Sequence, residues 1–442
     1  MKKKIGFVSL GCAKNLTDTE TMLALLQNDN YIITSDADDA DVIVVNTCAF
    51  IDSAKEESIN AILEMAQKKA DKCEVLVVTG CLAQRYADDI KNEIPEADII
   101  LGTNDYPRIA EAIDDFYKNG RKDVFVSDAN AHVTKDLPRA LSTPKHYAYL
   151  KIADGCDNHC TYCIIPKLRG KYRSRAEKSI IAEAKALAQS GVKELILVAQ
   201  DTAYYGCDNG GYALANLLEK LSEIDGIEWI RLQYCYPENV TDELIDEIAK
   251  NRKVVKYIDM PLQHVSDRIL KKMGRKSSFD EINVLRDKLR AKIPDIAIRT
   301  SLISGFPGET EEDFEILKKF LISKKLDKVG VFTYSREEDT AAAKFENQID
   351  EEVKSARRGA LMKVQNGISL AKNKAKIGSE VYAIIDSYDE GELCYIGRTY
   401  ADTPEVDEAA YIYSADELNS GDIVKIKVLD AHDYDITGEV IF

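Results

Sequence analysis

The sequence has no long apolar stretch and no low-complexity tract. Among its 442 residues nothing approaches the roughly 20 consecutive apolar residues of a membrane span. Residues 1–10 carry three lysines and a short apolar run without a small-residue cleavage site, and no long Pro, Ser or Gln tract marks disorder. We therefore expect a packed cytoplasmic protein without a membrane partner.

Positive charge is also in short supply. The chain has 59 Lys and Arg against 76 Asp and Glu, and its formal net charge is -17. Broad binding to nucleic acid needs a basic surface that displaces the counterions of phosphates. The composition therefore argues against nucleic acid as a partner and favours attraction to a basic protein.

The length predicts more than one domain, because single cores stop growing near roughly 250 to 300 residues. In residues 1–138 short apolar strands alternate with helical patterns, which predicts a doubly wound parallel α/β domain. Residues 131–145 lack periodicity, carry two prolines and are interpreted as a linker. The expected strands are 5–10, 42–45, 75–78 and 99–101, and the expected helices are 18–27 and 54–69.

The alternation resumes for six units in residues 139–375, which favours a partial (β/α)6 barrel of the TIM-like kind over a closed barrel of eight. It ends in a charged helix expected at 350–374. Residues 376–442 then change to short alternating strands with Gly, Asp and Pro turns, which predicts a small antiparallel β-barrel like the OB fold. The expected strands are 147–152, 194–199, 229–233, 257–260, 296–302 and 329–332, then 380–386, 392–399, 410–413, 423–429 and 436–441.

Cys156, Cys160 and Cys163 lie in one loop, with CxxxCxxC spacing, directly after the first central strand. Three thiolates can ligate three irons of a 4Fe-4S cube and leave the fourth iron open. The amino and carboxylate groups of S-adenosylmethionine (SAM) suit that open site, where an electron from the cluster would cleave SAM to a radical. A structural zinc loop is the alternative, but no second cysteine pair with zinc-finger spacing lies nearby.

Cys12, Cys48 and Cys81 each follow an apolar strand and precede a helix. The carboxyl ends of parallel strands form one crevice, so these three thiols can converge on a second cluster with an open iron. Three unrelated buried thiols are the alternative. Without a secretory signal, the ten cysteines do not suggest a disulfide framework. The remaining cysteines, interpreted as structural, are Cys73, Cys207, Cys235 and Cys394.

A Gly-rich turn at 304–310 closes the fifth central strand, and Thr310 is placed to cap the next helix. Gln263 and His264 follow the fourth strand on the same rim. For each strand-end residue taken alone, a structural hydrogen bond is the simpler interpretation. The predicted SAM contacts are Tyr162, Gln200, Asp201, Gly305, Phe306, Pro307, Gly308 and Glu309.

Over essentially its whole length the chain resembles the methylthiotransferase family of radical SAM enzymes. Gly11-Cys-Ala-Lys-Asn15 looks like the RimO branch, whereas the tRNA-modifying MiaB branch generally carries Gly-Cys-Gln-Met-Asn. Ala13 departs from the proline that is usual in the RimO branch. Further similar segments are Tyr147–Ile152, Ile164–Arg175, Met260–His264, Val331–Arg336 and Tyr395–Asp407.

The resemblance implies replacement of C-H by C-SCH3 at the β carbon of an aspartate in small-subunit ribosomal protein twelve. Sulfur and a methyl group from SAM would gather at the N-terminal cluster, and a flavodoxin or ferredoxin would supply electrons. The last domain would be of the TRAM type. The implied ligands of two 4Fe-4S clusters are Cys12, Cys48 and Cys81, and Cys156, Cys160 and Cys163.

The last domain is rich in acids from Asp386 to Glu439 and poor in basic residues. Such a barrel would repel tRNA phosphates and attract a ribosomal protein rich in Lys and Arg, although surface acids can also serve solubility alone. Two other functions stay open: the same chemistry on tRNA adenosine, and a non-catalytic iron-sulfur protein that binds ribosome or RNA. Failure to cleave SAM after reconstitution would favour the second.

Overall fold

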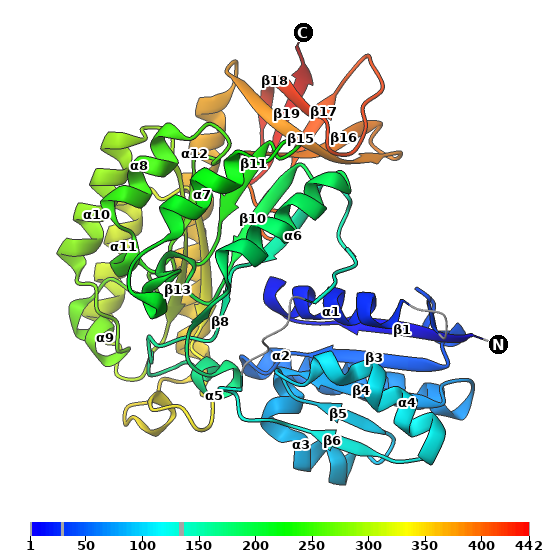
Figure 1. Cartoon of the computed structure of the whole chain (residues 1–442). Coiled ribbons are helices and arrows are strands. Elements are labelled where there is room, and N and C mark those ends of the chain that lie inside the picture. The colour runs from blue at the N-terminus through cyan, green and yellow to red at the C-terminus, as the bar shows by residue number, and fades with distance from the viewer. Residues whose placement is uncertain (1, 28–30, 132–136, 442) are drawn as a thin grey trace. The chain divides into compact units, whose positions relative to one another are not determined.

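The structure is a computed structural model that describes residues 2–27, 31–131 and 137–441 (Figure 1). The chain forms two compact units. The first unit combines Met1–Ser142 with Ala153–Arg173 and Ser335–Ala343, and the second contains the rest. These units are defined by spatial packing and combine separate stretches of the chain, so they do not test domain boundaries along the sequence. The boundaries expected at residues 138 and 375 stay predictions. Among the described residues no helix is long and apolar enough to cross a membrane.

A six-stranded parallel sheet in the order β2-β1-β3-β4-β5-β6 is the core of the first unit. Helices α1 and α4 cover one face, and α2 and α3 cover the other. This confirms the doubly wound α/β arrangement, and the all-buried strands β3 and β4 show why continuous apolar runs mark such a sheet. The bounds are β1 Lys3–Ser9, α1 Ala13–Leu26, β2 Tyr31–Ile33, β3 Val42–Thr47, α2 Asp52–Gln67, β4 Val75–Gly80, α3 Cys81–Glu93, β5 Ile99–Leu101, α4 Ile109–Asn119 and β6 Asp123–Phe125.

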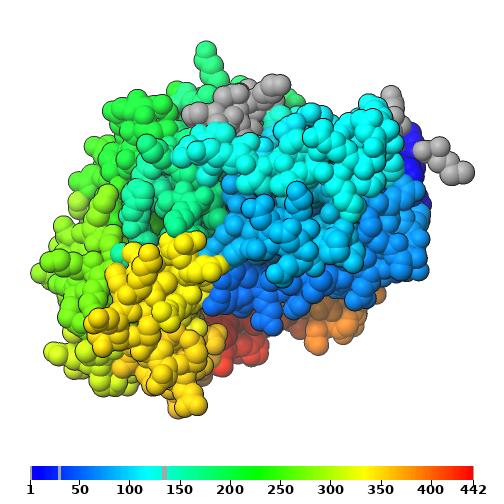
Figure 2. Space-filling model, turned by 90° about the horizontal axis from the view of Figure 1, so that it is seen from below, coloured from blue at the N-terminus to red at the C-terminus, as the bar shows by residue number. Residues whose placement is uncertain are grey.

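Two distant segments complete the first unit. The residues 153–173 contain β8 (Ala153–Asp154), α5 (Ile165–Arg169) and the first residue of β9 (Arg173–Ser174). The segment 335–343 contacts α2 and α3, because the buried Glu337 accepts hydrogen bonds from Lys55 Nζ (2.9 Å) and Arg85 Nη1 (3.0 Å). Figure 2 shows this contact where the yellow segment meets the blue one. The first unit is therefore assembled from three separate stretches of chain.

Six parallel strands form the half-barrel of the second unit, in two sheets ordered β11-β10-β7 and β12-β13-β14. A bridge between Ile230 and Val254 continues the pairing beyond β11. All six predicted central strands are present, which confirms the partial barrel. The bounds are β7 Tyr147–Lys151, α6 Glu177–Gln189, β10 Glu194–Val198, α7 Leu214–Ser222, β11 Trp229–Leu232, α8 Asp242–Lys250, β12 Tyr257–Asp259, α9 Asp267–Lys272, α10 Phe279–Lys292, β13 Ala297–Ser304, α11 Glu311–Lys324, β14 Lys328–Thr333 and α12 Glu351–Lys376.

The C-terminal part of the second unit is a closed five-stranded barrel in the order β15-β16-β17-β19-β18, as expected. Four of its neighbouring strand pairs are antiparallel, and β17 and β19 pair in parallel. Alternate residues such as Ala383 and Ile385 on one strand, and Ile426 and Val428 on another, fill the interior. The bounds are β15 Glu380–Asp389, β16 Cys394–Thr399, β17 Ala410–Tyr413, β18 Ile423–Ala431 and β19 Ile436–Val440.

Several acids that the sequence suggested for the barrel surface instead pair with basic residues of the same unit. Asp402 binds Lys328 (2.6 Å), and Asp407 binds Arg299 (3.2 Å). Glu408 also contacts Lys328. The acidic surface is therefore smaller than the sequence count indicated. The described acids of the barrel that remain exposed are Glu380, Glu390, Glu392, Glu405, Asp416, Glu417, Asp430, Asp433 and Glu439.

Candidate functional site

The N-terminal cysteine set consists of Cys12, Cys48 and Cys81, which lie at the ends of three neighbouring strands. Cys12 precedes α1 after β1, Cys48 follows β3, and Cys81 begins α3 after β4. The ends of β1 and β3 approach closely, since a Cβ atom on Gly11 would lie 2.9 Å from Cys48 Cβ and 3.2 Å from its Sγ. The structure thus brings together the residues that equivalent strand positions suggested.

The three thiols influence one another's ionisation. Desolvation raises the pKa of Cys48 to about 12, and negative charge on Cys81 and Cys12 adds to the rise. Desolvation also raises the pKa of Cys81. At Cys12 the desolvation is outweighed by the charges of Lys14 and Arg169 and by backbone amides, so its pKa is lowered. Three thiols at neighbouring strand ends form a donor set that fits an iron-sulfur cluster.

The second set lies in a loop, residues 154–171, that we term the cysteine loop. Its ends are closed, because Cys156 N donates to the Gly170 carbonyl at 3.0 Å. Gly155 has a φ of +77°, and a Cβ there would lie 2.0 Å from the Lys171 carbonyl oxygen, so only glycine fits. A bond from Cys163 N to the Cys160 carbonyl (3.0 Å) tightens the turn. One closed turn thus presents all three thiols.

No three His, Cys, Asp or Glu side chains within the described residues are arranged to hold a single metal ion. This finding concerns single ions, because an iron-sulfur cluster binds each thiolate to a different iron. The six cysteines stay the predicted cluster ligands.

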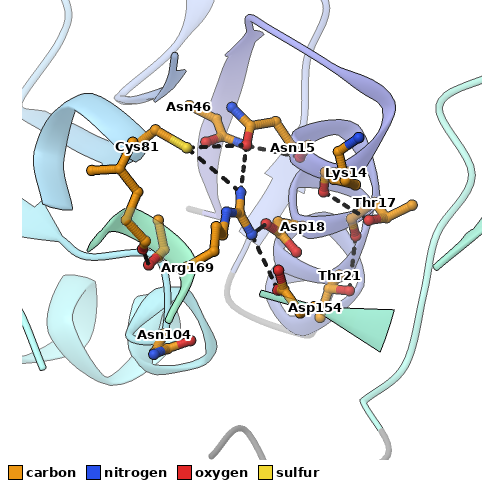
Figure 3. Close-up of polar contacts among 12 residues, drawn as sticks. Lys14, Asn15, Thr17, Asp18, Thr21, Asn46, Cys81, Asn104, Asp154 and Arg169 are labelled. Atoms are coloured by element: carbon orange, nitrogen blue, oxygen red, sulfur yellow. Dashed lines mark hydrogen bonds and ion pairs between the residues drawn. The ribbon is translucent and has the colours of Figure 1, made fainter. Parts of the chain in front are cut away.

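Arg169, at the end of α5, connects the surroundings of the two cysteine sets (Figure 3). Its side chain is buried. Nη1 binds Asp18 Oδ2 at 2.7 Å and Asp154 Oδ2 at 3.3 Å. Nη2 donates to Asn15 Oδ1 at 2.5 Å and lies 3.9 Å from Cys81 Sγ. One guanidinium therefore contacts α1, the N-terminal cysteine set and the residue that opens the cysteine loop.

This polar cluster was not predicted from the sequence. Asn15 and Asp18 lie three residues apart, on one face of a helix that begins right after Cys12. That spacing was the available signal on α1, and an Arg-Gly pair at the close of the cysteine loop was the signal on α5. Nothing in the sequence joins the two places.

The predicted SAM contacts in the second unit are held by protein partners. Asp201 accepts hydrogen bonds from Asn239 Nδ2 (2.6 Å) and from Tyr236 N (3.3 Å), which ties the loop after β10 to the loop after β11. Gln200 lies beside it and is half-buried. Tyr162 belongs to the first unit and is half-buried as well.

The Gly-rich turn after β13 packs against α12. Glu309 Oε2 accepts from Gly305 N (2.9 Å), and its Oε1 binds Arg357 Nη1 (2.8 Å). A Cβ on Gly305 would lie 2.3 Å from Lys354 Cγ, so this glycine permits the approach of α12. Phe306 and Pro307 are buried, and Gly308 is half-buried. Their contact with SAM stays a prediction.

His264 supports the same turn from the neighbouring strand end. Its ring is fully buried, Nδ1 accepts from Ser266 N at 2.9 Å, and Nε2 lies 3.6 Å from Glu309 Oε2. Gln263 holds a left-handed backbone conformation (φ +69°), which turns the chain at this point. Both residues therefore have a structural role at the rim of the half-barrel.

Thr310 caps α11 as predicted. Its hydroxyl accepts from Asp313 N (3.3 Å), and the Asp313 carboxylate accepts from Thr310 N (2.8 Å), which forms a capping box. We expect Thr310→Ala to cost about 1 kcal/mol of unfolding free energy, because a helix N–H loses its acceptor. Thermal unfolding would measure this loss. Thr310→Ser keeps the hydroxyl and should unfold like the parent chain; equal losses in both variants would contradict the capping role.

Three protein-family models match the chain. The model described as uncharacterized protein family UPF0004 matches residues 4–102, the radical SAM superfamily matches residues 150–321, and the TRAM domain matches residues 377–441. Among solved structures, the radical SAM methyltransferase TsrM from Kitasatospora setae is similar with a TM-score of 0.55 and 13% identity, covering 75% of this chain and 73% of that one. That likeness shows the fold.

Curated relatives match over the full length. The ribosomal protein uS12 methylthiotransferase RimO of Acetivibrio thermocellus is 52% identical and covers 100% of this chain and 99% of its own. RimO of Lachnoclostridium phytofermentans is 51% identical, covering 98% and 99%. RimO of Geobacter sulfurreducens is 48% identical, covering 100% and 99%. On this identity, with the radical SAM and TRAM matches in the expected order, the chain belongs to the RimO family of radical SAM methylthiotransferases.

Proposed function

We propose that this chain converts the β C-H of an aspartate in ribosomal protein uS12 to C-SCH3, using SAM and two 4Fe-4S clusters. Its relatives carry the name of that activity and match it from end to end. The observation that carries the two-cluster proposal is that two sets of three cysteines lie in one compact unit, with Arg169 contacting the surroundings of both.

The two sets of cysteines have separate proposed roles. When bound, the clusters and SAM supply the electron, the hydrogen-abstracting radical and the methylated sulfur of the reaction. The cysteine loop holds three thiols in one closed turn, and the N-terminal cysteine set holds three more at the ends of rigid strands, which fixes both donor sets before any ligand arrives. The proposed ligands are Cys156, Cys160 and Cys163 for the SAM-binding cluster, and Cys12, Cys48 and Cys81 for the other.

The proposed SAM contacts are also held in place by the chain's own residues. Backbone groups of the turn 305–309 are held in place by Glu309, and the end of β10 is held by Asp201. Such pre-formed walls suit a ligand that must be positioned accurately against a reacting carbon. The full proposed set is Tyr162, Gln200, Asp201, Gly305, Phe306, Pro307, Gly308 and Glu309.

The exposed acids of the C-terminal barrel support a basic protein as substrate. Among the described residues nine acids remain exposed there: Glu380, Glu390, Glu392, Glu405, Asp416, Glu417, Asp430, Asp433 and Glu439. They oppose the phosphates of tRNA and attract a Lys-rich and Arg-rich protein. We further propose that the reaction takes place in the cytoplasm and that a flavodoxin or ferredoxin delivers the electrons.

The test is methylthio transfer to a peptide. The reduced, reconstituted chain is incubated without oxygen with SAM, sulfide and a peptide copying the uS12 loop that contains the aspartate, and products are read by mass spectrometry. We expect one methylthio group on the aspartate and none on a matched peptide carrying Asn there. Modification of tRNA adenosine, with the peptide unchanged, would replace the proposed substrate by the one of the MiaB branch. SAM left intact would overturn the catalytic proposal.

A further inference from the structure

We infer that Arg169 is a positioning residue that holds positive charge at Cys81 Sγ and thereby raises the reduction potential of the N-terminal cluster. The inference rests on the proposed function, because it takes a cluster on Cys12, Cys48 and Cys81 as given. Its subject is the chain's own polar network, shown in Figure 3.

The guanidinium divides its contacts between two kinds of partner. Nη1 serves the two carboxylates, Asp18 at 2.7 Å and Asp154 at 3.3 Å. Nη2 serves the Asn15 amide oxygen and approaches Cys81 Sγ at 3.9 Å. A buried guanidinium needs a counter-charge, and Asp18 supplies it. The need to neutralise the guanidinium charge therefore explains the contacts of Nη1 with the carboxylates. The position of Nη2 is explained by its contacts with the Cys81 sulfur and the Asn15 amide.

Asn15 fixes that position. Its Nδ2 donates to the carbonyls of Leu10 (3.1 Å) and Thr47 (2.9 Å), the residues near the ends of β1 and β3. With both amide hydrogens occupied, Oδ1 must face Arg169 and the Cys81 thiol, which it meets at 3.8 Å. Asn15 thus joins the strand ends that carry the cysteine set, and Arg169 binds to the oxygen left over.

Positive charge beside a cluster thiolate stabilises the reduced form, which carries one more electron, and hydrogen bonds to cluster sulfurs act in the same direction. Removing Arg169 would take away that charge and so disfavour the added electron. Removing the Asp18 charge alone would have the opposite effect, so two variants of one network predict shifts of opposite sign.

The experiment is an anaerobic redox titration of the reconstituted full chain, followed by EPR. A variant with alanine at Cys156, Cys160 and Cys163 assigns the signal of the N-terminal cluster. For Arg169→Gln we expect the reduction equilibrium of that cluster to fall about tenfold, which is a midpoint potential lower by about 59 mV for one electron. For Asp18→Asn we expect a higher potential.

Two further variants separate the charge effect from general damage. Arg169→Lys keeps the charge and should shift the potential less than Arg169→Gln. Arg139→Gln removes a different arginine of the same unit, one whose side chain is 7% exposed and binds Glu20 through Nε at 2.7 Å, and should leave the potential unchanged. A shift in Arg139→Gln equal to that in Arg169→Gln would overturn the inference.

The outcomes also separate this inference from the proposed function. If the unaltered chain binds iron for a single cluster and shows no second EPR signal, the second cluster of the proposed function is wrong. If the second signal is present and Arg169→Gln keeps its potential, the inference is wrong. If Arg169→Gln does not bind iron, Asp18→Asn decides, because an unchanged potential there overturns the inference.

Discussion

Under the proposed function, Cys156→Ala should abolish SAM cleavage while the chain keeps about half of its reconstituted iron, since one of the two proposed four-iron sites has lost a ligand. The cysteine loop has three thiols and no spare, so we expect that the proposed SAM-binding cluster does not assemble. The N-terminal cysteine set is unchanged and should still bind iron. Iron and sulfide analysis gives the first number, and release of methionine from SAM under reducing conditions gives the second.

A reciprocal variant sharpens this prediction. Cys48→Ala should keep SAM cleavage and lose methylthio transfer, because it removes a ligand of the other set. Cys235→Ala is the matched control, since this thiol is fully buried but belongs to neither set. It should keep both activities. Wild-type SAM cleavage by Cys156→Ala would show that the assignment of the cysteine loop is wrong.

Glu194→Gln should cost roughly 3 to 5 kcal/mol of unfolding free energy, because it removes the negative charge that two buried arginines share. Glu194, in β10, is fully buried and accepts from Arg231 Nε at 2.7 Å and from Arg398 Nη1 at 2.8 Å. Arg398 belongs to the C-terminal barrel and keeps Asp386 as a second partner at 2.8 Å. Arg231 keeps its hydrogen bond from Nη1 to the carbonyl of Tyr400 (2.7 Å).

The measurement uses the only tryptophan of the chain. Trp229 lies two residues before Arg231 on β11, so its fluorescence in a denaturant series reports on this part of the molecule. Glu228→Gln makes the same chemical change on the exposed residue beside it and should alter stability by no more than about 0.5 kcal/mol. Equal losses in the two variants would contradict the role of the buried charge network.

The same variant predicts a pH dependence. Desolvation alone would raise the pKa of Glu194, but the charges of Arg398 and Arg231 outweigh it and lower the pKa below its ordinary value of 4.5. The folded state therefore binds this proton less readily than the unfolded state. The stabilisation is fully present above pH 4.5 and is lost as the pH falls below it, so parent and variant should converge in acid.

Much of the fold could be predicted because its signals are local. Strands β3 and β4 each begin with four consecutive apolar residues, and every strand of the half-barrel begins a repeated unit. The edge strands β2 and β6 were missed; each buries only one of its three residues, whereas the equally short β5 is buried throughout and was predicted. Helix α1 begins at Ala13, five residues before the predicted start, because its inward face carries Asn15 and Asp18 and shows no apolar period.

In the candidate site, too, some features have a signal in the sequence and others do not. The convergence of Cys12, Cys48 and Cys81 followed from their equivalent strand ends, which is a pattern that one sequence can show. The contact of Arg169 with Cys81 joins residues 88 positions apart, and its contact with Asn15 joins residues 154 apart. The number of acids in the last domain overestimated its acidic surface. Asp402 and Asp407 pair with Lys328 and Arg299, and this pairing is visible only in the folded chain.

The first unit needs the segment 335–343, which is made long after Ser142. A ribosome adding roughly 5 to 20 residues per second takes on the order of 10 to 40 seconds to cover that distance. During this interval Arg85 lacks its partner Glu337, and α2 and α3 lack the segment that later covers them. The nascent N-terminal sheet therefore stays unfinished, without the segment that covers α2 and α3, until the second half of the chain emerges.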